Sequence, residues 1–235
     1  MATNLKALLR ERFIFLLASP LVLLLTGCLK TTGQLAVFED AWKLAFASNK
    51  VDTGKLSKQF EYLLMYVNGS PALMTLGKRT LTQTPQGDIV DEFWFTPDGE
   101  MLHTRNGRIH VMFGLPVEWR NNKSTPPTWQ ESFSLTGATS WLRVRDEMPY
   151  YRFGISDKIT TTALASPPKL DKIALELAPT QNPQIKWVQD KVETSTNKGQ
   201  RWEFTQVFAI DQNQVVYSEQ CISPVFCFQI QRVKR

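Results

Sequence analysis

The sequence predicts a mainly β protein in which antiparallel sheets form barrel- or sandwich-like halves. Most of the chain consists of short apolar or alternating runs separated by Asn-Gly, Asp-Gly and proline-containing turns. The long helical patterns that alternate with strands in a parallel α/β fold are missing. The composition is that of a globular protein, because 43% of the 235 residues are hydrophobic and 21% are charged.

An export signal is predicted over residues 1–27. Lys6, Arg10 and Arg12 form a basic start, and residues 13–25 follow without a charge. As a helix this apolar run would span about 20 Å, which is short of the roughly 30 Å hydrocarbon core of a membrane. A cleaved signal peptide is therefore favoured over an uncleaved membrane anchor.

A lipid-attachment motif ends this segment. Leu25, Thr26 and Gly27 precede Cys28, as in the lipobox of bacterial lipoproteins, where small residues let the backbone enter a peptidase site. The thiol of Cys28 would carry a diacylglycerol, and two or three acyl chains hold a protein durably on a membrane. The next residue is Leu29 rather than the aspartate that favours inner-membrane retention. We therefore expect the periplasmic face of the outer membrane.

The net charge argues against a nucleic-acid partner. The full chain carries +5, and the signal peptide contains three basic residues and one acidic residue, so cleavage leaves +3. Such a small charge does not provide the basic surface that nucleic-acid binding requires.

A short lipidated tether, residues 28–34, leads into one amphipathic helix. Its apolar residues recur at helical spacing. They are Leu35, Phe38, Ala41, Trp42, Ala45 and Phe46. The helix is expected to end at residues 48–49, with its aromatic side chains in the core.

Residues 35–120 are expected to combine this helix with an N-terminal β half. Strands are predicted over residues 60–67, 72–82, 89–95, 100–105 and 108–113. The Asn106-Gly107 turn predicts a two-residue hairpin loop, which sets Arg105 opposite Arg108, Thr104 opposite Ile109 and His103 opposite His110. The buried face of this hairpin would carry Leu102, Thr104, Ile109 and Val111.

His103 and His110 are the two histidines of the chain, and the predicted register makes them weak candidates for a metal site. Against this interpretation, two arginines lie beside them and no Cys, Asp or Glu is fixed nearby at the spacing of a ligand. We therefore expect no metal and no cofactor.

Residues 129–235 are expected to form a C-terminal β half, after a polar connector at residues 120–128. Strands are predicted over residues 172–177, 201–210, 215–219 and 225–233. Trp202, Phe204, Phe208 and Ile210 share one face of the second of these strands.

With Cys28 lipidated, Cys221 and Cys227 remain as a pair. A pair of cysteines in an oxidising periplasm normally forms a disulfide. Catalytic thiol exchange usually uses a two-residue spacing at a helix N-terminus, so we expect a structural disulfide that joins two strands.

No catalytic constellation emerges from the sequence. There is no glycine-rich phosphate loop, nucleophile elbow or HExxH motif. The carboxylates of Asp88, Asp91, Glu92, Asp98 and Glu100 cluster in sequence, but they are more typical of turns and solvent-facing positions than of a glycosidase pair. We therefore predict that the protein is not an enzyme.

Several segments together resemble the YjbF/GfcB (YmcC-like) lipoproteins. They are residues 68–77, 94–95, 98–109 and 114–115, and residues 217–220 with Pro224. The resemblance implies a mostly β fold and a role in group 4 capsule or related exopolysaccharide export, beside an outer-membrane barrel protein and a periplasmic partner. The sequence departs from the family pattern at residues 207–211, where an aromatic-rich strand with a glycine-containing turn is expected.

We therefore predict a non-catalytic outer-membrane lipoprotein that assists the assembly or export of a capsular or extracellular polysaccharide. One alternative is a glycan-binding or glycan-modifying periplasmic protein, which would have a cleft with paired carboxylates or a two-histidine metal site. Another is a carrier of lipids or lipoproteins, which would have a continuous apolar cavity. An assembly role instead predicts a filled core and an exposed patch.

Overall fold

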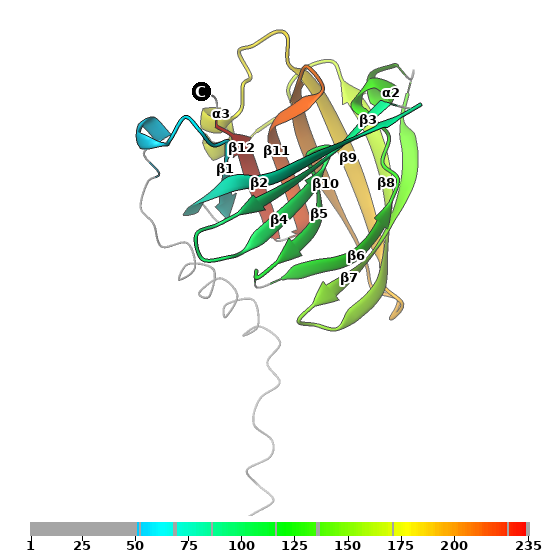
Figure 1. Ribbon diagram of the computed structural model, residues 1–235. Coiled ribbons are helices and arrows are strands. Elements are labelled where there is room, and N and C mark those ends of the chain that lie inside the picture. The colour runs from blue at the N-terminus through cyan, green and yellow to red at the C-terminus, as the bar shows by residue number, and fades with distance from the viewer. Residues whose placement is uncertain are drawn as a thin grey trace, which may run out of the picture. The chain divides into compact units, whose positions relative to one another are not determined.

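The structure is a computed structural model that describes residues 51–233 except 52, 68, 69, 86, 116, 135, 136, 171 and 225 (Figure 1). These residues belong to one compact unit, residues 40–235. The predicted signal peptide, lipobox, tether and amphipathic helix lie outside the described residues.

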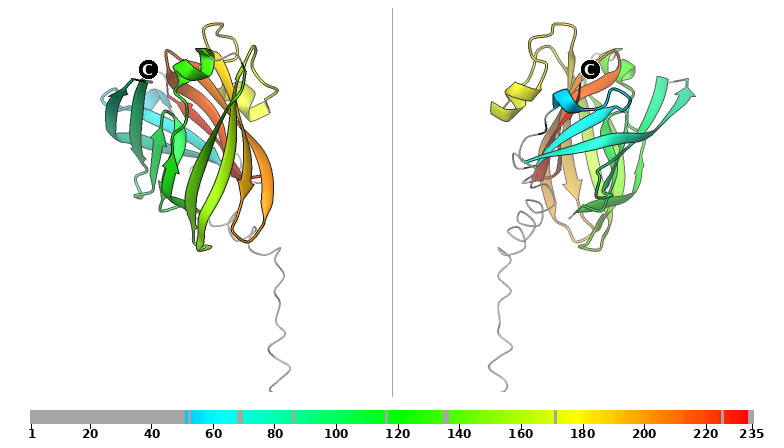
Figure 2. Two further views of the ribbon diagram at one scale, coloured as in Figure 1. Left: turned by 90° about the vertical axis from the view of Figure 1, so that its right-hand side faces the viewer. Right: turned by 60° about the vertical axis from the view of Figure 1, so that its left-hand side comes forward.

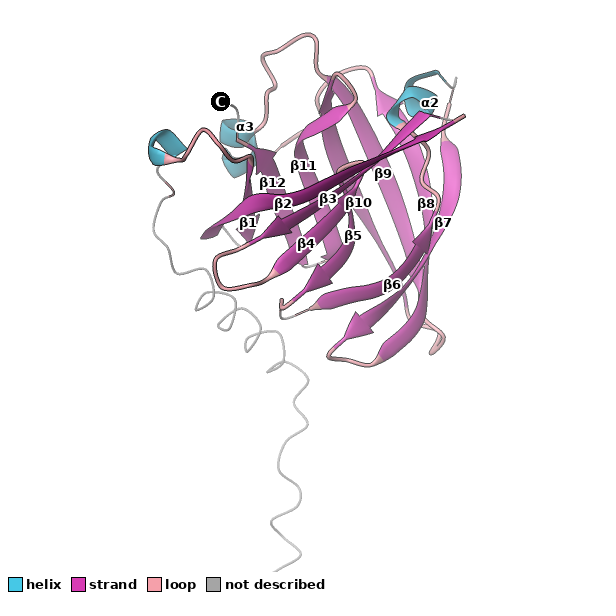
Figure 3. Cartoon of the chain, viewed as in Figure 1, coloured by secondary structure: helices cyan, strands magenta, loops and turns pink. Residues whose placement is uncertain are grey.

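In the part of the chain that the structure describes, twelve antiparallel strands form one continuous sheet (Figure 3). They are β1 (Tyr62–Val67), β2 (Ser70–Thr84), β3 (Gly87–Phe95), β4 (Met101–Arg105), β5 (Arg108–Phe113), β6 (Glu118–Ser124), β7 (Thr139–Met148), β8 (Arg152–Leu164), β9 (Lys186–Ser195), β10 (Arg201–Asp211), β11 (Gln214–Ser223) and β12 (Phe226–Arg232). Short helices accompany the sheet: η1 (Thr53–Lys55), α2 (Trp129–Ser134) and α3 (Lys172–Leu177). The prediction of a mainly β fold is confirmed.

The sheet curls into a nearly closed barrel. Its strand order is β5-β4-β3-β2-β1-β12-β11-β10-β9-β8-β7-β6, so the first and last strands of the chain, β1 and β12, pair in the middle of the sheet. The two edge strands, β5 and β6, approach each other, and Asn122 Nδ2 of β6 donates a hydrogen bond to the His110 carbonyl of β5 at 3.0 Å. Curling hides most of the exposed edge that a flat sheet would have.

An apolar cluster fills the barrel beside β1–β5 and β12. Large side chains from the inner faces of these strands meet there, with Trp94, Met65, Met74, Leu102 and Met112 completely buried. Trp119 of β6 joins the same cluster. Alternation places these residues inward and their chain neighbours outward, as the period of a strand requires.

The strand predicted over residues 172–177 is wrong, because this segment forms α3. Ala174 and Ala178 are buried one helical turn apart, and the Ala178 N–H donates to the Ala174 carbonyl at 2.8 Å. Both pack with Trp187, Ala209 and Tyr217, which lie on the outer face of β9–β11. Figure 2 shows α3 outside the barrel wall. The helix therefore covers an apolar outer surface that the local alternation of residues does not reveal.

The prediction of a polar connector at residues 120–128 is also wrong for residues 120–124. Residues 120–124 belong to β6, and Arg120 pairs with Asp146 of β7. Polar residues suit this position because β6 is an edge strand. Thr128 then caps α2, since its Oγ1 accepts a hydrogen bond from the Glu131 N–H at 3.2 Å.

The β4–β5 hairpin has the predicted turn, with φ of 49° at Asn106 and 74° at Gly107. Arg105 pairs with Arg108 and Thr104 with Ile109, as predicted. A bulge then shifts the register, so that His103 lies opposite Val111 rather than His110. The buried face accordingly has Met112 in the place predicted for Val111. A bulge inserts one extra residue, which turn chemistry alone does not indicate.

Candidate functional site

The lipobox residues Leu25, Thr26, Gly27 and Cys28 lie outside the described residues, so lipid attachment stays a prediction. Within the described part of the chain, no helix has both the length and the apolar character needed to cross a membrane.

The two histidines lie together on the outer side of the β4–β5 hairpin. Their ring centroids are 4.9 Å apart in an edge-to-face arrangement, although the bulge prevents direct pairing. His103 Nε2 lies 2.7 Å from Asp91 Oδ1, and Arg105 Nε donates to the same oxygen at 2.9 Å. The Phe93 ring stacks on His103, with centroids 4.2 Å apart.

Burial controls the electrostatics of this group. Burial lowers the pKa of His110 to about 4, and the positive charge of Arg105 adds to this shift. Burial also lowers the pKa of His103, although Asp91 opposes the effect. For Asp91, burial raises the pKa, but the hydrogen bonds from Arg105 and His103 together outweigh it, and the pKa is lowered. At neutral pH the group is thus two neutral imidazoles beside an Arg105–Asp91 ion pair.

This arrangement does not match the donor set of a zinc site. Asp91 is the carboxylate next to the histidines, and Arg105 already binds both of its oxygens. Among the described residues, no group of three or more His, Cys, Asp or Glu side chains is placed to hold a metal ion.

The Asn106–Ile109 turn region, which carries much of the family resemblance, crosses the interior and binds the opposite wall. Gln220 of β11 donates from Nε2 to the Gly107 carbonyl and accepts from the Ile109 N–H, both at 2.8 Å. Trp129 Nε1 of α2 donates to the Asn106 carbonyl at 3.1 Å. The turn is therefore a structural lock between the two sides of the barrel.

Arg108 completes this lock with a buried ion pair. Its Nε donates to Asp190 Oδ2 at 2.9 Å, and its Nη2 donates to Oδ1 at 3.3 Å. The guanidinium lies 3.9 Å from the centre of the Trp129 ring. Asp190 also accepts a hydrogen bond from Thr161 at 2.6 Å. These contacts give the two buried side chains their hydrogen-bond partners inside the barrel.

A second buried ionic group lies further along the interior, on β7 and β8. Arg143 Nε and Arg145 Nε donate to the same Asp157 oxygen at 2.7 and 2.9 Å, and Arg145 Nη1 donates to Glu147 at 3.0 Å. Both guanidinium groups lie against the ring of Trp119. Burial raises the pKa of Asp157, but the two arginines outweigh it and the pKa is lowered.

Sequence reasoning missed this ionic group because buried charges are rare. The sequence signal for it is the alternation of apolar and charged residues in β7, which is the reverse of the usual one. Leu142 and Val144 face solvent, whereas Arg143 and Arg145 are buried. The chemistry of the group is that of a structural network. Asp157 and Asp190 each accept hydrogen bonds from arginine and threonine, and the pKa of Asp157 is lowered, which is opposite to the raised pKa of a general acid.

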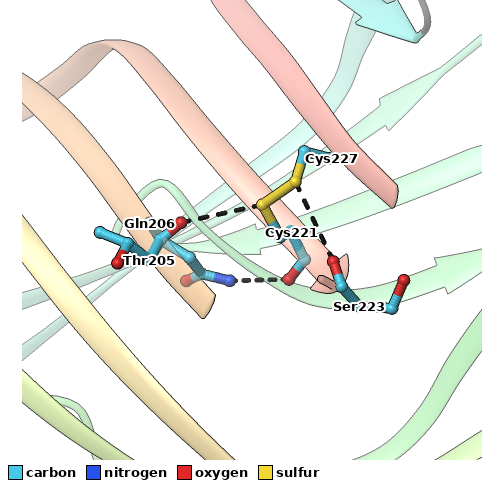
Figure 4. The surroundings of a disulfide bond; sticks show 5 residues. All are labelled: Thr205, Gln206, Cys221, Ser223 and Cys227. Carbon is cyan, nitrogen blue, oxygen red and sulfur yellow. Dashed lines mark hydrogen bonds between the residues drawn. A yellow bond between two sulfur atoms is a disulfide. The ribbon is translucent and has the colours of Figure 1, made fainter. Parts of the chain in front are cut away.

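The structure contains a disulfide between Cys221 and Cys227 (Figure 4). The two residues are direct partners in the β11–β12 hairpin. Gln206 Nε2 of β10 donates to the Cys221 carbonyl at 2.9 Å. Cys221 is buried and Cys227 is exposed, and as direct cross-strand partners their side chains lie on the same face of the hairpin.

Exposed apolar side chains lie on the outer face of β3–β5. The register places Phe95, Met101 and Phe113 in one row across these strands, with Phe95 41% and Phe113 50% exposed. Tyr151 and Phe153 at the β7–β8 turn are exposed as well. Contiguous exposed apolar side chains often mark a protein-interaction surface.

The comparisons with known proteins point to one family. The family described as "Group 4 capsule polysaccharide lipoprotein gfcB, YjbF" matches residues 43–232. The fold is similar to the crystal structure of the hypothetical lipoprotein YmcC from Escherichia coli (K12), with a TM-score of 0.56 and 15% sequence identity. The alignment covers 83% of this chain and 96% of that chain. Among curated proteins, no sequence matches significantly.

Proposed function

Because the chain belongs to the YjbF family of group 4 capsule polysaccharide lipoproteins, we propose that it is a non-catalytic outer-membrane lipoprotein that assists the assembly or export of a capsular or extracellular polysaccharide. The family match over residues 43–232 is the observation that carries the proposal. Cys28 would hold the β barrel at the periplasmic face of the outer membrane through its acyl chains.

The barrel interior supports a scaffold rather than a carrier or an enzyme. One part of the interior is packed with large apolar side chains such as Trp94 and Met65. Another part is occupied by the Arg108–Asp190 pair and by the ionic group around Asp157. A carrier of lipids would need this space as a continuous apolar chamber.

The exposed row of Phe95, Met101 and Phe113 supports contact with other proteins of an export system. We expect the partners to be an outer-membrane barrel protein and a periplasmic protein. An aspartate in place of Phe113 would have to lose the water around its charged carboxylate when a partner binds. The F113D variant should therefore weaken co-purification of the partners while the protein stays folded.

Deletion of the gene tests the function directly. We expect the amount of polysaccharide on the cell surface to fall, and expression of the wild-type chain in trans to restore it. Unchanged surface polysaccharide in the deletion strain would overturn the proposal.

Membrane fractionation of the Cys28→Ala variant tests the anchor separately. We expect wild type in the outer-membrane fraction and the variant outside it, because the variant lacks the thiol that carries the lipid. Equal amounts of both in the outer-membrane fraction would contradict an anchor at Cys28.

A further inference from the structure

One end of the barrel has a polar cleft that the proposed scaffold role does not require. Its volume is about 320 Å³, near the lower end of the roughly 300–1,000 Å³ that is typical of small-ligand sites. Four segments form it: the start of β3, Asn106 in the β4–β5 turn, the Thr128–Gln130 segment at α2, and the β10–β11 turn. Both views in Figure 2 show α2 beside the β10–β11 turn at this end.

Carboxamide groups dominate the mouth of the cleft. Gln130, Gln212, Asn213 and Gln214 are all exposed there, and Asp88 lies across from them on β3. None of the described residues that line this cleft is a lysine or an arginine. A carboxamide both donates and accepts hydrogen bonds without carrying a charge, and so does the hydroxyl group of a sugar. The mouth is therefore chemically suited to a neutral ligand with many hydroxyl groups.

The cleft continues inward into a smaller cavity of about 70 Å³. The two spaces share Val90, Asn106, Asn213 and Gln214 among their lining residues. A water molecule takes up roughly 30 Å³ in the liquid, so the inner cavity has room for a small polar group such as a hydroxymethyl arm or for one or two waters. Leu63, Val215 and Ile230 contribute apolar walls.

Two of the residues that line the inner cavity each have a buried polar atom without a partner in the protein. Thr104 is 3% exposed, and its Oγ1 makes no hydrogen bond. Arg232 Nε is also buried and unpaired, although the rest of this guanidinium binds Glu92 and Glu61. A buried hydroxyl without a hydrogen-bond partner is unfavourable, and a ligand hydroxyl bound to Thr104 would remove this penalty.

We propose that the cleft binds a short, uncharged segment of a glycan, with sugar hydroxyls held by the Gln130 and Gln214 carboxamides and one polar arm reaching Thr104. This inference deepens the proposed function and rests on it for the identity of the polymer. An anionic sugar is disfavoured at the mouth, because its carboxylate would meet Asp88 there and none of the described residues that line the mouth is a lysine or an arginine.

Binding is tested with the full lipoprotein in a detergent that contains no sugar, by isothermal titration calorimetry. The probes are maltotriose, cellotriose, mannotriose, triacetylchitotriose and trigalacturonate, and neutral oligosaccharides released from the surface polymer of the source cells. We expect at least one neutral probe to bind and trigalacturonate to bind more weakly. No binding by any neutral probe, or preferred binding of trigalacturonate, would overturn the inference.

Three variants locate the site. Gln130→Ala and Gln214→Ala should each weaken binding of the best neutral probe about three- to tenfold, as expected for the loss of one hydrogen bond. Thr104→Val should weaken it similarly without lowering the melting temperature of the free protein, because it removes a hydroxyl that has no protein partner. Gln200→Ala, an exposed glutamine in the β9–β10 turn away from the cleft lining, is the matched control and should bind like wild type. Unchanged binding by all three cleft variants would reject this location.

The inference and the proposed function fail in different experiments. If deletion of the gene lowers surface polysaccharide but no neutral probe binds, only the inference that the cleft binds a glycan is refuted. If probes bind in the cleft but deletion leaves surface polysaccharide unchanged, the proposed role in export is refuted and the binding site is retained.

Discussion

Replacing Arg108 by methionine tests the conclusion that the Asn106–Ile109 block is a structural lock. Methionine is unbranched and replaces the aliphatic stem of the arginine, but it cannot pair with Asp190. The variant therefore leaves a carboxylate with 0% side-chain exposure without its main cationic partner. Loss of the partner removes hydrogen bonds of 2.9 and 3.3 Å to Asp190.

The expected loss of stability is large. Breaking a buried ion pair from one side typically costs about 3–5 kcal/mol, because the remaining charge stays buried and uncompensated. For a chain of this size, each kcal/mol lowers the melting temperature by about 2–4 °C, so Arg108→Met should melt about 6–20 °C below wild type. Arg105→Met is the matched control on the same hairpin. Its ion pair with Asp91 is partly exposed, so the control should cost no more than about 1 kcal/mol.

A double-mutant cycle shows whether the loss comes from the pair itself. Asp190→Asn keeps an acceptor for the Thr161 hydroxyl but removes the charge that Arg108 compensates. The Arg108→Met/Asp190→Asn variant should be about 1–3 kcal/mol more stable than the sum of the two single losses predicts, measured by urea unfolding. The reasoning would be refuted if Arg108→Met cost as little as Arg105→Met, or if the single losses simply added.

Three further predictions concern stability. The unfolded chain binds more protons than the folded chain between the pKa of buried His110, about 4, and its ordinary value of 6.5. The free energy of unfolding should therefore fall by up to about 1.4 kcal/mol per pH unit over this window as the pH drops, and His110→Gln should reduce the slope in urea titrations. Gly107→Ala should cost about 2–5 kcal/mol in the same assay, because φ is +74° and the new Cβ would lie 2.4 Å from a Val215 methyl carbon; a loss below 1 kcal/mol would contradict this. Replacing Cys221 and Cys227 together by alanine should lower stability by about 2 kcal/mol, the loop-closure entropy of so short a loop, and a reducing agent should then have no further effect on the melting curve.

Local turn chemistry explains which parts of the fold could be predicted from sequence. The Asn106-Gly107 turn requires positive φ at both positions, and β5 begins and ends where the sequence predicts. The disulfide partners also follow from counting cysteines in a chain that is predicted to be exported, with Cys28 set aside for the lipid.

The parts that were missed depend on contacts between distant segments. α3 is helical because Ala174 and Ala178 fit the outer face of β9–β11, a surface that no local pattern describes. The pairing of β1 with β12 joins the first and last strands of the chain, and nothing local specifies it.

The interior charges and the cleft could not be predicted for the same reason, because both depend on contacts between distant segments. Asp157 and Arg145 look like solvent-facing residues until the barrel closes around them. The cleft collects residues from four segments that are far apart in the sequence, including Gln130 and Gln214. Sequence patterning predicts which residues alternate, whereas the closed sheet determines which of them meet.

The distribution of polysaccharide between the cell interior and the cell surface tests the central claim most directly. In a strain that lacks this protein, assistance in export predicts that surface polymer falls while polymer accumulates inside the outer membrane, and that the wild-type chain reverses both changes. An unchanged distribution in the deletion strain would contradict the account.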